Sequence, residues 1–229
     1  MEYRFRPNGL LISGFINDPE NEAIVFAPGL PQYITKYHPL IRKLAGMNYN
    51  VFVPQYYGSF KSKGIFTLAN SIKTISDTID FVRKGQAGNL YDNSLISWKP
   101  AITLIGFSYG GLPSLMNADK VKKIVLISPL IDYKIHLKFG GEDLRRTFEF
   151  ARRAFSYKLS PEDLLKEFEE FNYEKTASFT IIHGSEDKSI PLEEIKEVAR
   201  DTGARLIMHN SGHTSNIPEE VLRDVLLSE

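Results

Sequence analysis

Short runs of mostly apolar residues alternate with amphipathic segments along most of the chain. Continuous apolar runs of this kind are typical of strands that are buried on both faces of a sheet. They occupy residues 23–26, 51–54, 102–107, 124–127, 179–182 and 205–208. The clearest amphipathic segment is 67–84, where apolar residues recur in steps of three and four before Gly85, as on one face of a helix. Helices are also predicted at 37–45, 192–200 and 218–227.

The first residues follow a different pattern. Residues 3–6 and 10–16 are both compatible with strands, and they flank Asn8-Gly9, the pair most favoured in a two-residue hairpin loop. We therefore expect an antiparallel hairpin at this end. From residue 23 onward, strands alternate with helices, which predicts an α/β protein with a mostly parallel twisted sheet and helices on both faces.

Residues 140–171 interrupt this alternation, because they hold two helix-like segments and no strand pattern. The second segment begins at Ser160-Pro161, a capping serine followed by a first-turn proline. The length suits one domain. We predict a single domain over residues 1–229 with residues 134–176 as a small helical insertion. A polar stretch to about Trp98 leads into the strand before Ser108.

Charge and composition exclude several classes of protein. The 28 Lys and Arg residues balance 28 Asp and Glu residues, so no net field favours nucleic acid or an anionic membrane as a partner. There is no cysteine, which excludes disulfides, thiolate catalysis and cysteine-based metal sites. Gly-x-Gly-x-x-Gly, Walker and His-Glu-x-x-His motifs are also missing from the sequence, so we expect no cofactor and no metal.

The start of the chain, Met1 to Pro7, lacks the apolar core of a signal peptide. No run of residues approaches the ~20 apolar positions of a membrane span. We therefore expect a cytoplasmic protein. The pattern leaves the oligomeric state open.

The most informative motif is Gly106-Phe107-Ser108-Tyr109-Gly110. It follows directly on the apolar run at 102–107 and precedes a helix-like segment, which is the strand–turn–helix context of a nucleophile elbow. In such a turn the glycines keep side chains away from the neighbouring strand and helix. Ser108 is therefore the candidate nucleophile, exposed at the carboxyl edge of the sheet.

An activated serine needs a nearby base, and five histidines are available. His183 and His209 end apolar strands and are expected to be structural. His38, at a helix start, and His136, near the insertion, are expected to be partly exposed. His213 lies in the loop after the last predicted strand, where a base can reach a serine on the same edge of the sheet.

The base in turn needs an acid that orients it. Asp187 follows the strand at 179–182 in a short polar loop, so it should reach the same edge. The order Ser108, Asp187, His213 is the order expected of a triad on this kind of sheet. Asp132, after the strand at 124–127, is the alternative acid.

At this point the chain resembles the α/β-hydrolase family over nearly its whole length. The resemblance is carried by the Ser108 motif, by His183-Gly184-Ser185-Glu186-Asp187 with Ile190-Pro191, by Ser211-Gly212-His213, and by Phe26-Ala27-Pro28-Gly29-Leu30. It implies Ser108 as nucleophile, His213 as base and Asp187 as the acid.

The resemblance also implies residues around the nucleophile. The loop after the strand at 23–26 would help form an oxyanion hole, with backbone N–H groups of Tyr109 and Leu30 as donors and Gly29 beside the substrate. Many members of the family have His-Gly in this loop, whereas this chain has Pro-Gly. Tyr57 either lines the pocket or packs within its loop. The insertion would act as a lid over the site. Within it, Phe148 either faces the substrate or packs the helices onto the domain.

These observations predict a serine hydrolase that cleaves carboxylic esters of small-to-medium acyl groups through an acyl-enzyme. The first alternative is the same chemistry on short peptides, acyl-amino acids or thioesters. A peptidase would favour an acidic cluster near the pocket, for which Glu142-Asp143 is the candidate. The second alternative is a catalytically silent scaffold on the same fold, since fold does not determine function.

Overall fold

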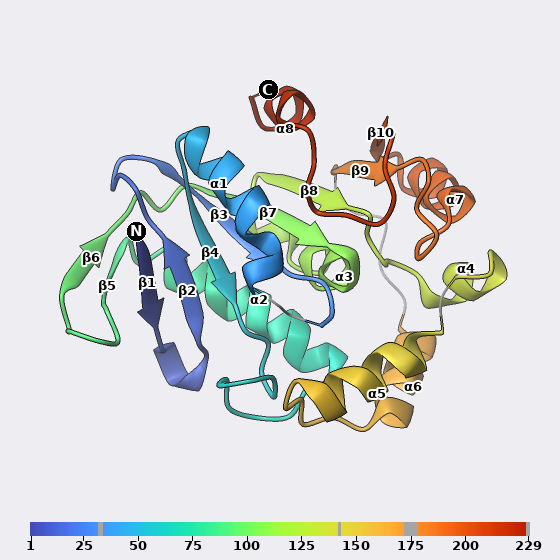
Figure 1. Ribbon diagram of the computed structural model, residues 1–229, viewed down its shortest axis with the longest axis horizontal. Helices are drawn as coiled ribbons and strands as arrows, with labels where there is room; N and C mark the ends of the chain where they lie inside the picture. The colour runs from blue at the N-terminus through green and yellow to red at the C-terminus, as the bar shows by residue number, and fades with distance from the viewer. Residues whose placement is uncertain (32–33, 142, 172–177, 228–229) are drawn as a thin grey trace.

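The computed structural model describes residues 1–31, 34–141, 143–171 and 178–227 of the chain. An eight-stranded sheet runs through its centre (Figure 1). In spatial order its strands are β1 (Glu2–Phe5), β2 (Ile12–Phe15), β4 (Tyr49–Pro54), β3 (Glu22–Ala27), β7 (Ile102–Phe107), β8 (Lys123–Ile127), β9 (Thr180–Gly184) and β10 (Arg205–His209).

The direction of the strands follows the predicted pattern. β1 and β2 pair antiparallel, and β2 also runs antiparallel to β4. From β4 to β10 every neighbouring pair is parallel. The carboxyl ends of the parallel strands therefore meet at one edge of the sheet, where loops that follow them can assemble a site.

Helices cover both faces of the sheet. On one face, α1 (His38–Gly46) and α8 (Glu219–Leu227) pack with side chains such as Ile24 and Phe26. The other face, which includes Val25, packs against α2 (Leu68–Val82), α3 (Gly111–Leu115) and α7 (Leu192–Thr202). Successive residues of β3 thus enter opposite cores, which explains why the predicted strands are continuously apolar.

The N-terminal hairpin differs from the prediction in its turn. Phe5 pairs with Ile12, so six residues connect the strands instead of two. Pro7 begins a short 3₁₀ turn, and Asn8 and Gly9 have φ of 50° and 85°. The longer turn buries the side chains of the next two residues, 10 and 11, in the core. Burying these leucines outweighs the preference for a tight turn.

The polar stretch before β7, for which the sequence predicted no particular element, holds β5 (Gln86–Gly88) and β6 (Leu95–Ser97). These strands form a separate two-stranded antiparallel sheet. Three residues are too few to establish a period along the sequence.

Between β8 and β9 the described residues form three helices: α4 (Tyr133–Lys138), α5 (Leu144–Ala154) and α6 (Pro161–Glu170). The last two correspond to the predicted helical segments, whereas α4 is additional. In Figure 1, α5 and α6 lie beyond the carboxyl ends of the strands, on the same side of the molecule as the start of α2. Residues 172–176 of the predicted insertion lie outside the described residues.

The connection between α5 and α6 is attached to the loop after β4. The amide of Phe66 donates to the carbonyl of Lys158 at 2.8 Å, and the amide of Lys158 donates to the carbonyl of Gly58 at 2.7 Å. The carboxylate of Glu167, on α6, accepts a hydrogen bond from the amide of Leu68 at the start of α2. These bonds hold the helical segment against the α/β core at both of these points.

Among the helices that the structure describes, none has the length and the apolar character needed to cross a lipid bilayer.

Candidate active site

The turn between β7 and α3 carries Ser108. Its φ is 52°, in the left-handed region that non-glycine residues rarely occupy. The carbonyl of Ser108 accepts a hydrogen bond from the amide of Leu130 at 3.0 Å, which connects this turn to the loop after β8. A serine held in this conformation at the end of a buried strand has the geometry of a nucleophile elbow.

The glycines of this turn are explained by close backbone approach. A Cβ on Gly106 would lie 2.6 Å from the carbonyl oxygen of Gly110. On Gly110 it would lie 2.1 Å from the carbonyl oxygen of Ala27, and on Gly111 it would lie 2.5 Å from Cβ of Pro129. No side chain fits at these distances, so the motif is required by packing around Ser108.

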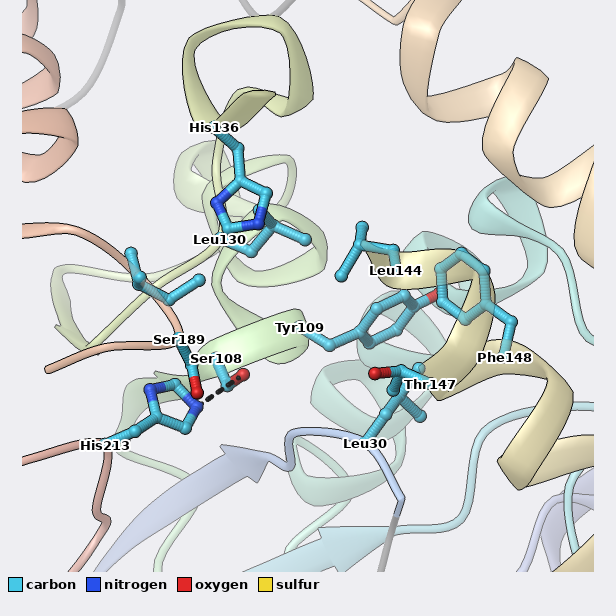
Figure 2. A pocket seen from close by; sticks show the side chains of 11 residues that line it. Leu30, Ser108, Tyr109, Leu130, His136, Leu144, Thr147, Phe148, Ser189 and His213 are labelled. Atoms are coloured by element: carbon cyan, nitrogen blue, oxygen red, sulfur yellow. Dashed lines mark hydrogen bonds between the residues drawn. The ribbon is translucent and has the colours of Figure 1, made fainter. Parts of the chain in front are cut away.

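Ser108, His213 and Asp187 form a chain of hydrogen bonds. Nε2 of His213 lies 3.0 Å from Oγ of Ser108 (Figure 2), and Nδ1 of His213 lies 2.8 Å from Oδ2 of Asp187. The other carboxylate oxygen of Asp187 accepts from the amides of Ser189 and Ile190, each at 2.9 Å. This arrangement can take a proton from the serine hydroxyl while the carboxylate maintains the tautomer of the imidazole.

The loops that carry Asp187 and His213 follow neighbouring parallel strands, β9 and β10. Backbone hydrogen bonds continue beyond the strands, from Ser185 to His209 and from Glu186 to Ser211, each at 2.9 Å. The two loops are therefore held side by side, and this determines the spacing between the acid and the base.

Burial and hydrogen bonding act in opposite directions on Asp187. Desolvation by burial would raise the pKa of its carboxyl group. The hydrogen bond and charge of His213, with the amide of Ile190, hold that pKa below its ordinary value. The carboxylate is thus ionised at neutral pH, as a group that stabilises an imidazolium must be.

The loop after β3 packs against the serine. A Cβ on Gly29 would lie 2.9 Å from Cβ of Ser108, so this position has room only for glycine. Two tyrosine hydroxyl groups hold the loop in place. Tyr37 donates to the carbonyl of Gly29 at 3.1 Å, and Tyr56 donates to the carbonyl of Pro28 at 2.8 Å.

A cavity of about 200 Å³ opens in front of Ser108 (Figure 2). It is lined by Leu30, Ser108, Tyr109, Leu130, His136, Leu144, Thr147, Phe148, Ser189, Ile190 and His213. The wall formed by Tyr109 is rigid, because its hydroxyl lies 2.7 Å from Oγ of Ser71. Its ring also packs edge-on against Phe148, with ring centroids 6.4 Å apart.

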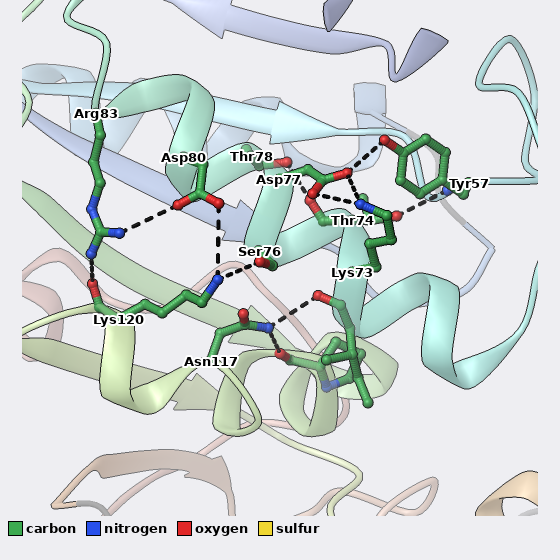
Figure 3. A network of polar contacts seen from close by, with 12 residues as sticks. Tyr57, Lys73, Thr74, Ser76, Asp77, Thr78, Asp80, Arg83, Asn117 and Lys120 are labelled. Carbon is green, nitrogen blue, oxygen red and sulfur yellow. Dashed lines mark hydrogen bonds and ion pairs between the residues drawn. The ribbon is translucent and has the colours of Figure 1, made fainter. Parts of the chain in front are cut away.

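Tyr57 is not among the residues that line this cavity. Its hydroxyl donates to a carboxylate oxygen of Asp77 at 2.7 Å, and its amide donates to Oγ1 of Thr74 at 3.0 Å (Figure 3). Lys73 completes this group through an ion pair with Asp77 at 2.8 Å. In the structure, Tyr57 is thus held by contacts with α2 and lies outside the lining of the cavity in front of Ser108.

No protein-family model matches the sequence, and no curated protein matches it either. Several solved structures are similar to this chain over nearly their whole length, at low sequence identity. Est1E from Butyrivibrio proteoclasticus has a TM-score of 0.67 at 15% identity, covering 97% of this chain and 94% of that one. An esterase from Exiguobacterium antarcticum has a TM-score of 0.68 at 15% identity, covering 100% of both chains.

A third similar structure is the thioesterase domain from the curacin biosynthetic pathway. Its TM-score is 0.64 at 12% identity, and the match covers 100% of this chain and 99% of that domain. The chain has the α/β-hydrolase fold. This confirms the fold that the four sequence motifs indicated, including its mostly parallel sheet and antiparallel start.

The prediction for His136 was also wrong. It was expected to be partly exposed, but its side chain is fully buried and Nδ1 lies 2.7 Å from Oε2 of Glu194, which is also fully buried. Burial raises the pKa of Glu194, while the imidazole of His136 opposes this rise. Glu194 comes from the first turn of α7, where an acidic residue ordinarily predicts a solvated position, so the sequence carries no signal for this pair.

Asp132, the alternative acid, is the N-terminal cap of α4. Its carboxylate caps α4 by accepting from the amides of Lys134 and Ile135 at 2.8 and 3.0 Å. Asp143 caps α5 in the same way, through the amide of Arg145 at 2.9 Å. Glu142, the other half of the predicted acidic cluster, lies outside the described residues.

Among the described residues, no group of three or more His, Asp or Glu side chains is arranged to hold a metal ion. His183 and His209 both have a lowered pKa because burial disfavours the charged imidazole. For fully buried His183, the nearby carboxylate of Asp187 opposes this effect without reversing it.

Gly110→Ala should destabilise the protein by more than about 2 kcal/mol, because its Cβ would meet the backbone of β3 and force the turn apart. Gly46→Ala is the matched control, since a Cβ at Gly46 meets nothing within 4 Å. It should change the free energy of unfolding by less than about 1 kcal/mol. Urea denaturation of both variants tests this, and equal stability of the two would contradict the packing argument.

The lowered pKa of His183 predicts a pH-dependent stability. The unfolded chain binds a proton near pH ~6.5, whereas the folded protein binds it only at lower pH, so the free energy of unfolding should fall as the pH drops below about 6.5. His183→Asn removes this contribution. Denaturation at several pH values should give a shallower dependence for the variant, and parallel curves would show that His183 is not responsible.

Proposed function

We propose that the protein is a serine hydrolase that cleaves carboxylic esters of small-to-medium acyl groups. Ser108 is the nucleophile, His213 the general base and Asp187 the group that orients the base. The observation that carries the proposal is the continuous chain of hydrogen bonds from Ser108 through His213 to Asp187 at the edge of a cavity. A buried carboxylate, an imidazole and a serine in this order match the requirements for activating a hydroxyl.

In the proposed mechanism, Oγ of Ser108 attacks the ester carbonyl and its proton moves to Nε2 of His213. The tetrahedral intermediate collapses, His213 returns the proton to the departing alcohol, and an acyl group remains on Ser108. Water then attacks the acyl-enzyme by the same route, with His213 again as base, and releases the carboxylic acid. Asp187 stays ionised throughout and stabilises the imidazolium.

The developing oxyanion would be bound by the backbone N–H groups of Tyr109 and Leu30. Preorganised amides stabilise negative charge without rearranging during the reaction. Support comes from the contact of Gly29 with Ser108 and from the two tyrosine hydroxyls that hold this loop. Gly29 would thus leave space for the substrate carbonyl.

The size of the cavity supports the small end of the proposed acyl range. At ~30 Å³ for each water-sized group, a cavity of about 200 Å³ holds about six or seven non-hydrogen atoms. Phe148 would contact the acyl group, since it lines the cavity. We propose residues 134–176 as the lid of a single domain; the attachment of α6 to the start of α2 favours a fixed cover.

Similar structures support an ester substrate. Est1E has been solved with ferulic acid bound, and other similar structures are esterases from Exiguobacterium antarcticum and Pyrococcus furiosus. Thioesters are the second candidate, because the thioesterase domain of the curacin pathway is similar over its whole length. The predicted cytoplasmic location and the lack of a cofactor stay predictions.

Ser108→Ala should remove turnover of short 4-nitrophenyl esters, by at least about 10⁴-fold, because no hydroxyl remains to attack the carbonyl. Thermal unfolding should remain close to wild type, since among the described residues the side chain hydrogen-bonds to His213 alone. Comparable turnover by the variant would eliminate Ser108 as the nucleophile.

Asp187→Asn should lower kcat by about 10³–10⁴-fold, because the amide no longer holds Nδ1–H of His213 in the correct tautomer. Asp132→Asn is the matched control: asparagine also caps helices well, so its kcat should stay within about threefold of wild type. The opposite ranking of the two variants would assign the acid to Asp132.

A further inference from the structure

We infer that the cavity selects acyl groups that carry an oxygen substituent, and that Thr147 is the residue that recognises it. The inference rests on the proposed function and specifies its substrate class: short hydroxyacyl or oxoacyl esters rather than plain alkanoyl esters.

Most of the cavity wall is hydrocarbon. Six of its residues present apolar surface: Leu30, Tyr109, Leu130, Leu144, Phe148 and Ile190. A wall of this kind favours an acyl chain and contributes little to orienting it. In such pockets the few polar groups determine which substituents are accepted.

Thr147 places a hydroxyl in this apolar surrounding. It lies on α5 beside Phe148, whose side chain is completely buried, and Thr147 itself is half-buried. Figure 2 shows its oxygen directed into the space between Ser108 and the ring of Tyr109. An acyl group on Ser108 would therefore pass close to this hydroxyl.

The hydroxyl of Thr147 is available, unlike those of other helical threonines. Thr74, Thr78 and Thr202 each donate to the carbonyl four residues earlier at 2.7 Å. Among the described residues Thr147 makes no such bond, nor any other side-chain hydrogen bond. A hydroxyl that faces a cavity without a protein partner can both donate to and accept from a ligand.

A second polar group enters the same cavity from α4. His136 is held by Glu194 at 2.7 Å, and both side chains are fully buried. Burying such a pair costs free energy that an apolar pair would not, and its placement in the wall makes this part of the cavity polar. In Figure 2, His136 approaches from α4 while Thr147 approaches from α5. An oxygen substituent at this end of the cavity would bond to the hydroxyl of Thr147, whereas a methyl group in the same place would not.

Pairs of esters that differ only in one group test this inference. The 4-nitrophenyl esters of 3-hydroxybutyrate and 3-methylbutyrate have nearly the same shape, as do those of 2-hydroxybutyrate and 2-methylbutyrate. For wild type, kcat/KM should favour the hydroxy ester of at least one pair by about five- to tenfold, as expected of one hydrogen bond.

Two variants assign this preference to Thr147. Thr147→Val keeps the shape of the side chain and removes the hydroxyl, so it should abolish the preference or reverse it. Thr147→Ser keeps the hydroxyl and should retain a preference for the hydroxy ester. Thr202→Val is the control, because it removes a helical hydroxyl outside the cavity and should leave the ratio at the wild-type value.

The outcomes separate the inference from the proposed function. Turnover of all esters with no preference in wild type, or an unchanged preference in Thr147→Val, would overturn the role of Thr147 and leave the esterase intact. Absence of turnover of every ester by folded wild-type protein would overturn the proposed function, and this inference with it.

Discussion

The turn at Ser108 is the constraint on which the rest of the site depends. A residue with φ of 52° follows a buried strand, and the backbone of Ala27 and the side chain of Pro129 lie against the glycines around it. Strain of this kind persists only where the surrounding structure enforces it. Here the enforcing contacts come from β3 and from the loop after β8, on either side of β7. The serine is consequently presented to the cavity in one position.

The other members of the proposed triad depend on the order of the strands. β8, β9 and β10 are parallel neighbours, so the loops after β9 and β10 leave the sheet at the same edge as Ser108. A Cβ on Gly184 would lie 2.4 Å from the carbonyl oxygen of Ser211, which shows how closely these two loops pack. Residues separated by 105 positions, Ser108 and His213, thus come within 3.0 Å of each other. The geometry of the site is a property of the sheet and of the loops attached to it.

The sequence predicted the features that depend on local pattern or on order along the chain. Continuous apolar runs identified the buried strands, and the positions of Asp187 and His213 after strands indicated that they would meet Ser108, as the hydrogen bonds show. The catalytic roles themselves stay predictions. The prediction of a two-residue turn between β1 and β2 was wrong, because Leu10 and Leu11 are buried in the core. The sequence pattern does not reveal this burial.

The cavity was harder to predict, because loops that follow five different strands form it together with α4 and α5. Phe148 was one of several aromatic residues in the insertion, and no pattern distinguished its cavity-lining role. His136 and Glu194 are 58 residues apart, and each taken alone is an ordinary surface-type residue. Thr147 carries no sequence signal at all, since its importance depends on the direction of its hydroxyl. Side-chain direction and long-range pairing are decided by tertiary packing, which a single sequence pattern does not contain.

Whether Ser108 is an activated nucleophile can be measured with a fluorophosphonate probe. The probe reacts covalently with serines that a neighbouring base has activated, and peptide mass spectrometry then locates the adduct. We expect one adduct, on Ser108, and none on the other serines. Labelling of a different serine, or no labelling of folded protein while a known serine hydrolase reacts in parallel, would contradict it.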